Sequence, residues 1–210
     1  MNTLEDAWNW YQEARRHVGL VRRLAAAYWH ELPWAGPLGQ DDRFKELDRA
    51  RLQEESSTTL AQMDDLAVLV LFSVFESQVR ERLVAELKKE VSEKAVSHSV
   101  LLQAVEDLVQ QVEEGSFFKV LAPYKTLDHD LVEQVNQVRR YRNWVAHGKR
   151  GRKPSAVDPR TAYERLDRFW KVLNPQSIGP QSSDGAGRGC IHSRLSPHPP
   201  RRLSRAGTRR

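Results

Sequence analysis

Apolar residues recur at helical spacing over the first part of the chain. Between Thr3 and Glu31 they follow one another at intervals of three, four or seven, the period of an amphipathic helix; they are Leu4, Trp8, Tyr11, Val18, Val21, Ala25 and Tyr28. Thr3 with Asp6 three residues later predicts the N-cap of this helix. The prolines and glycines of residues 33–39 then predict a loop.

The next stretch predicts a central helix. A helical pattern starts near Asp41 and continues through the sequence SSTT at 56–59, where hydroxyl and β-branched residues weaken it. Residues 60–90 follow without glycine or proline and with an almost wholly apolar middle. Because a helix that is apolar on every side must be surrounded, we expect this one at the centre of the fold.

Three further helices are predicted, over 97–113, 127–146 and 158–173. Gly148 stands where a left-handed C-terminal residue is expected after the second of them, and Asp158 followed by Pro159 predicts the start of the third. No segment alternates between apolar and polar with period two. The sequence therefore predicts an all-α protein, a bundle of about five helices.

Charge divides the chain into two parts at Asn174. Residues 1–174 are nearly neutral, with 26 basic and 27 acidic side chains, whereas residues 175–210 carry seven Arg and one acid, Asp184. The first part predicts a single domain. The second is rich in Ser, Pro, Gly and Arg and predicts a disordered tail, which either adds salt-sensitive affinity for RNA or is solvated without a role.

Other features bear on location and partners. The longest unbroken apolar run is Leu66 to Phe72, shorter than the roughly 20 residues of a membrane span, and the first ten residues lack a basic signal-peptide region. Cys190 is the single cysteine. We therefore expect a cytoplasmic protein with no membrane partner. No phosphate-binding glycine motif or metal-ligand spacing occurs, so no cofactor or metal is expected.

Residues 134–157 form the one concentrated positive segment of the neutral part. These 24 residues contain no acid and seven cations, namely Arg139, Arg140, Arg142, Lys149, Arg150, Arg152 and Lys153. Guanidinium groups bind phosphate oxygens bidentately, so a polyanion such as RNA is the natural partner. The alternative is a solvated charged face that only aids solubility.

Within this segment, the stretch Arg142-Asn143-Trp144-Val145-Ala146-His147-Gly148 resembles the Rx4-6H signature of the HEPN superfamily, all-α domains that include many metal-independent RNases. Upstream, the sequence LFSVFESQVRERL at 71–83 is similar to the apolar helix with an embedded Glu of several HEPN families, and Glu76 is the matching residue. The resemblance covers roughly residues 59–150.

The resemblance implies a homodimeric, metal-independent endoribonuclease of toxin-antitoxin or antiphage systems, with an antitoxin or other regulatory protein as a further partner. RNA transesterification needs a base, an acid and positive charge on the phosphorane, which His147 and Arg142 from two copies can supply. Asn143, one turn before His147, would orient its imidazole. Glu76 is a further catalytic candidate, and the cations Arg139, Arg140, Lys149, Arg150, Arg152 and Lys153 would hold the RNA backbone.

Several alternatives stay open at this stage. The domain could be a non-catalytic HEPN-like module that binds RNA, a nucleotide or a protein. Arg142 could form a structural ion pair with Glu76, and His147 could be an ordinary C-terminal histidine favoured by the helix dipole. The tryptophans of residues 8–34 could stack on bases, although aromatic residues at helical spacing usually form a core.

Overall fold

The computed structural model describes residues 1–94, 98–126 and 128–174. Over these residues the regular structure is helical and includes no strand, which confirms the predicted all-α class. The five longer helices of the described chain are α1, α3, α4, α6 and α7, in agreement with a bundle of about five. The predicted disorder of residues 175–210 concerns a segment outside the described residues.

Helix α1 (Leu4–Ala27) begins at the predicted cap. The Oγ1 of Thr3 accepts a hydrogen bond from the Asp6 N–H at 3.0 Å, and the Asp6 carboxylate accepts one from the Thr3 N–H at 3.1 Å. This reciprocal arrangement is a capping box. The helix ends at Ala27, four residues earlier than predicted, and the short helices η1 (Trp29–Glu31) and α2 (Pro37–Gln40) follow.

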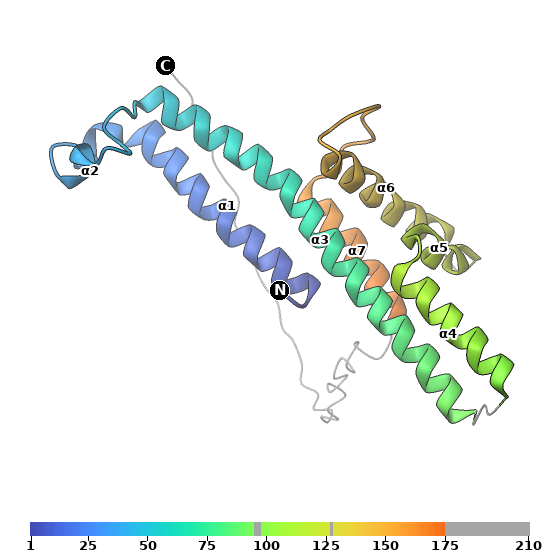
Figure 1. Ribbon diagram of the computed structural model, residues 1–210. Coiled ribbons are helices and arrows are strands. Elements are labelled where there is room, and N and C mark those ends of the chain that lie inside the picture. Colours follow the sequence, from blue (N-terminus) through green and yellow to red (C-terminus); the bar gives the residue numbers. More distant parts are fainter. Residues whose placement is uncertain (95–97, 127, 175–210) are drawn as a thin grey trace, which may run out of the picture. The chain divides into compact units, whose positions relative to one another are not determined.

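Helix α3 (Arg49–Glu93) joins the two predicted helical stretches into one helix of 45 residues. Asp48 caps it by accepting the Arg51 N–H at 2.7 Å. The SSTT sequence does not interrupt the helix: the Ser57 hydroxyl donates back to the Gln53 carbonyl at 2.8 Å, and Ser56 is buried. As predicted, α3 is central: it packs against α1, α4, α6 and α7 (Figure 1).

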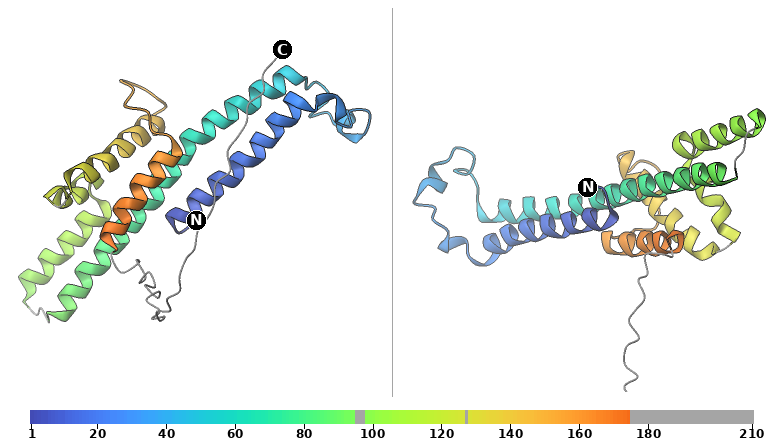
Figure 2. Two further views of the ribbon diagram at one scale, coloured as in Figure 1. Left: turned by 180° about the vertical axis from the view of Figure 1, so that it is seen from behind. Right: turned by 90° about the horizontal axis from the view of Figure 1, so that it is seen from below.

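The remaining elements are α4 (Ser99–Glu114), α5 (Phe117–Leu121), η2 (Ala122–Thr126), α6 (His129–Ala146) and α7 (Pro159–Leu173). Asp128 and Asp158 cap α6 and α7 through hydrogen bonds to backbone N–H groups, and Pro159 occupies the first turn of α7 as predicted. Helices α1 and α4 lie along different parts of α3, as all views show (Figure 2).

The core forms where α3, α5, α6 and α7 meet. Phe72 and Phe75 of α3 pack edge-on against Phe117 of α5, with ring centres 5.6 and 5.9 Å apart. Phe75 also meets Phe169 of α7 at 5.8 Å, and the side chains of Phe72, Phe75 and Phe169 are at most 2% exposed. Edge-on aromatic pairs are a favoured geometry, so this cluster fixes α7 and α5 on α3.

Helix α3 is also the one helix of the described chain that is long and apolar enough to cross a membrane, with an 18-residue stretch of mean hydropathy 1.5. The length of the unbroken apolar run, Leu66 to Phe72, did not indicate this. The mean hydropathy over 18 residues stays high although it includes single polar residues such as Ser73. One third of that stretch is buried within the protein, and the core helix of a water-soluble protein meets the same two criteria.

Candidate functional site

The basic segment begins on α6 and continues past its C-terminal end, in a turn with two residues in the left-handed region. Gly148 has φ +70, which confirms the glycine predicted at this position, and Lys149 has φ +61. The Gly148 N–H donates to the Val145 carbonyl at 3.0 Å and the Lys149 N–H to the Trp144 carbonyl at 2.8 Å, the two bonds of a Schellman motif. The left-handed conformation costs a lysine on the order of 1 kcal/mol.

His147 directly follows the last residue of α6 as its C-cap, and it is exposed to solvent. Its backbone has left the helical conformation (φ −90, ψ 22), while its N–H still donates to the Asn143 carbonyl at 3.0 Å. An exposed imidazole is accessible to a substrate and can serve as acid or base near neutral pH.

Arg142 lies in the last turns of α6 and is half-buried. Its Nη1 donates to the Asn143 Oδ1 at 3.0 Å, and its guanidinium carbon lies 5.6 Å from the centre of the Phe72 ring in the core. Its Nε is buried without a hydrogen-bond partner among the described atoms. The side-chain oxygen of Asn143 thus holds Arg142, whereas the sequence suggested that Asn143 orients His147.

Glu76 forms an ion pair with Arg80, whereas the sequence suggested Arg142 as its partner. Its Oε1 accepts from the Nη2 of Arg80 at 2.5 Å, one turn further along α3. Arg80 in turn donates to the carbonyl of Gly115 at 2.9 Å and to that of Val112, and so ties the end of α4 to α3. Glu76 and Arg80 are 23% and 16% exposed, so this is a largely buried structural pair.

The cations predicted to bind RNA have different surroundings. Arg139 stacks on Phe118 at 5.3 Å, and burial lowers the pKa of its guanidinium. Arg140 pairs with Glu133, and Lys149 pairs with Asp65 at 2.5 Å. The remaining three, Arg150, Arg152 and Lys153, lie exposed in the turn and loop after α6. The loop therefore carries the most accessible positive charge of the segment.

Asp65 of α3 holds two parts of the basic segment, and sequence reasoning did not identify it. Its Oδ1 accepts the Tyr141 hydroxyl at 2.7 Å and its Oδ2 pairs with the Lys149 ammonium. The side chain of Asp65 is only 15% exposed. Burial and the bond to Asp65 raise the pKa of Tyr141 to about 12. An acidic pair at 64–65 directly before an apolar run was the signal available in the sequence.

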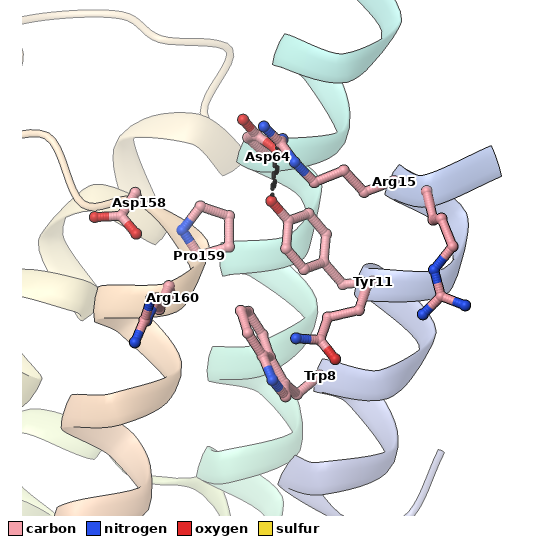
Figure 3. Close-up of a pocket in the computed structure, with 9 residues that line it drawn as sticks. Trp8, Tyr11, Arg15, Asp64, Asp158, Pro159 and Arg160 are labelled. Atoms are coloured by element: carbon pink, nitrogen blue, oxygen red, sulfur yellow. Dashed lines mark hydrogen bonds and ion pairs between the residues drawn. The ribbon is translucent and has the colours of Figure 1, made fainter. Parts of the chain in front are cut away.

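Asp64, the preceding residue, makes a matching arrangement with α1. Its Oδ1 accepts the Tyr11 hydroxyl at 2.7 Å and also contacts Arg15 (Figure 3). Burial and this hydrogen bond raise the pKa of Tyr11 to about 12. These residues line a cavity of about 660 Å³ between α1, α3 and the start of α7, where Asp158 and Arg160 also lie. Neither Arg142 nor His147 lines it.

Three of the four tryptophans between residues 8 and 34 pack against other aromatic side chains. Trp8 stacks on Tyr163 with ring centres 5.0 Å apart, and Trp29 contacts Trp34 at 4.3 Å. Trp10 is 39% exposed. Trp8 thus has a packing role between α1 and α7, and Trp29 and Trp34 pack against each other.

Among the residues that the structure describes, no group of three or more His, Cys, Asp and Glu side chains is placed to hold a metal ion. Comparisons with models of protein families, with curated proteins and with solved structures give no match to this chain.

Proposed function

We propose that the protein is a metal-independent endoribonuclease of HEPN type that acts as a cytoplasmic homodimer. The observation that carries this proposal is an exposed histidine, His147, at the end of α6, between a fixed arginine, Arg142, and a loop of exposed cations. The similarity of residues 142–148 to the Rx4-6H signature supports the same chemistry. A role in a toxin-antitoxin or antiphage system, with a regulatory protein partner, follows from the family resemblance alone.

In this mechanism the imidazole of His147 transfers the proton. It accepts the proton of a ribose 2′-hydroxyl as that oxygen attacks the adjacent phosphorus, and a second His147 from the partner copy protonates the departing 5′-oxygen. A single chain offers one such histidine in this segment, so a dimer supplies the acid and the base together. The products are a 2′,3′-cyclic phosphate and a 5′-hydroxyl.

Arg142 stabilises the negative charge on the phosphorane oxygens. Its contacts with Asn143 and Phe72 fix the guanidinium on α6, so that little ordering is needed when RNA binds. Asn143 acts by holding Arg142. The exposed Arg150, Arg152 and Lys153 bind backbone phosphates next to the site.

A second candidate is a non-catalytic module that binds RNA, a nucleotide or a protein. It is favoured by the half-burial of Arg142, whose guanidinium contacts Asn143 and the core residue Phe72. Neither His147 nor Arg142 lines the cavity between α1, α3 and α7 or the one of about 550 Å³ between α3 and α4. In this case the basic segment binds its ligand without reaction.

The deciding experiment is cleavage of a mixed-sequence RNA by the purified full-length protein in excess EDTA. The wild type is expected to produce ends with 2′,3′-cyclic phosphate, and His147→Ala to lose this activity. Arg142→Lys keeps a charge but not the planar fork, and should lower cleavage strongly. His129→Ala is the matched control, because His129 is an exposed histidine at the other end of α6. Retained RNA binding without cleavage in the wild type would favour the second candidate.

A further inference from the structure

The turn after α6 holds a lysine in a conformation that glycine normally occupies. Gly148 and Lys149 both have positive φ, at +70 and +61, and only the first is a glycine. The left-handed backbone conformation is disfavoured for a residue other than glycine, and it persists where surrounding contacts hold the residue in place. Lys149 is held by the bond of its N–H to the Trp144 carbonyl at 2.8 Å and by the ion pair of its ammonium with Asp65 at 2.5 Å.

Asp65 contacts the chain before and after the candidate catalytic residue, in α6 and in the turn that follows it. Its Oδ1 accepts the hydroxyl of Tyr141, six residues before His147, at 2.7 Å, and its Oδ2 pairs with Lys149, two residues after it. The rings of Tyr141 and Trp144 lie 5.8 Å apart, and the Lys149 ammonium lies 5.8 Å from the Trp144 ring, so the anchors also contact each other through Trp144. Both ends of the segment that carries His147 are thus fastened to α3.

We infer that Asp65 is a positioning residue, which fixes the place and direction of the His147 imidazole by clamping Tyr141 and Lys149. This inference rests on the role of His147 in the proposed function. It also changes the role of Lys149, whose ammonium is neutralised by a largely buried carboxylate and anchors the turn, so that it is not a contact to the RNA backbone.

Asp64 provides a matched control for Asp65. It is the adjacent residue of the same helix and also accepts a tyrosine hydroxyl at 2.7 Å and pairs with a cation, but both partners, Tyr11 and Arg15, belong to α1. Asp64→Asn and Asp65→Asn each remove the negative charge that pairs with the cation and keep a side-chain oxygen that can accept the tyrosine hydroxyl, and only the partners of Asp65 adjoin His147.

The test combines NMR of the histidine rings with RNA kinetics on the full chain. The ring signal of His147 is assigned from its disappearance in His147→Gln. In Asp65→Asn we expect this signal to shift or broaden, and single-turnover cleavage at saturating RNA to fall about tenfold or more because the imidazole is misplaced. RNA affinity should stay equal or increase, since the Lys149 ammonium is released. Asp64→Asn should leave the His147 signal unchanged and cleavage within about twofold.

Lys149→Gly covers the case in which Asp65→Asn fails to fold. Glycine adopts positive φ readily, so this variant keeps the turn and removes only the anchor. A shifted or broadened His147 signal with unchanged RNA affinity is expected. An unchanged His147 signal in Lys149→Gly or in a folded Asp65→Asn, or an equal shift in Asp64→Asn, would overturn the inference. The NMR result stands if the wild type cleaves no RNA, which would remove the proposed function but not the positioning.

Discussion

Asp64 and Asp65 are consecutive residues of α3, and each accepts a 2.7 Å hydrogen bond from a tyrosine of a different helix. Asp64 binds Tyr11 of α1, and Asp65 binds Tyr141 of α6. Successive residues of a helix point about 100° apart, so two adjacent acids can hold two neighbours of one central helix. The N-terminal helix and the helix that bears the candidate site are thus each bonded to the same central helix through a separate carboxylate.

These two bonds predict that stability falls at alkaline pH. The pKa values of Tyr11 and Tyr141 are raised from the ordinary 10.0 to about 12, because burial and the neighbouring carboxylates disfavour the phenolate. A group whose folded pKa is raised stabilises the fold below its unfolded pKa and loses that contribution as pH rises through the folded value. The free energy of unfolding, measured in urea from pH 9 to 12, should decline between about 10 and 12.

A double variant, Tyr11→Phe with Tyr141→Phe, tests the cause of this decline. It lacks both hydroxyls and should be less stable at pH 8, but its stability should fall less steeply than that of the wild type above pH 10. Equal slopes in the two proteins would show that other groups, such as lysines, govern the alkaline transition.

A second prediction concerns Glu76, which the sequence offered as a catalytic candidate. Glu76→Gln keeps the side-chain volume but loses the ion pair with Arg80, and should lower the free energy of unfolding by roughly 1–2 kcal/mol. Cleavage of RNA per folded molecule should be unchanged. Chemical denaturation and activity at a temperature well below the transition measure the two quantities.

Arg80→Ala completes this comparison. Arg80 also donates to the carbonyls of Val112 and Gly115, so its loss leaves three acceptors without a partner and should cost roughly 2–3 kcal/mol, more than Glu76→Gln. A strong loss of activity in Glu76→Gln without loss of stability would instead assign Glu76 to the reaction.

The features that local chemistry determines could be predicted from the sequence. Helix caps depend only on residues within one turn of the helix end. The structure confirms the predicted N-caps at Thr3 with Asp6 and at Asp158 with Pro159, and the predicted glycine at Gly148. The continuity of α3 could not be predicted as firmly. Ser57 is a weak helix former, and its hydroxyl is accommodated by a bond to the Gln53 carbonyl, which propensity alone does not reveal.

The candidate site was predictable only as a set of positions. The spacing of Arg142 and His147 places both near the end of one helix, and the structure has them there. The partners of these residues come from far along the chain: Phe72 lies beneath Arg142, and Asp65 binds Lys149. Such contacts depend on how α6 docks on α3, and helical spacing carries no information about docking.

A third prediction concerns the start of α7. Asp158 accepts the Thr161 N–H at 3.0 Å and its hydroxyl at 2.6 Å, and these bonds hold the pKa of Asp158 below its ordinary value. Asp158→Ala should cost about 1 kcal/mol at pH 7. Because the folded pKa is lowered, the difference between variant and wild type should persist above pH 4 or so and vanish as pH falls through the pKa of the folded protein. Equal differences at pH 3 and pH 7 would contradict this assignment.

The last prediction separates phosphate contacts from structural cations within the basic segment. Arg152 is exposed in the loop after α6, whereas Lys149 is paired with Asp65. If Arg152 binds a backbone phosphate, Arg152→Ala should weaken RNA binding and make the slope of log affinity against log salt shallower by about 0.7, the value for one phosphate of a single strand. Arg43→Ala removes an exposed arginine elsewhere and controls for the change in net charge.

Lys149→Gly should leave the slope as in the wild type, since the charge of Lys149 is already neutralised by Asp65. If Lys149→Gly reduced the slope as much as Arg152→Ala, Lys149 would exchange Asp65 for phosphate on binding, and the turn that carries His147 would open when RNA arrives.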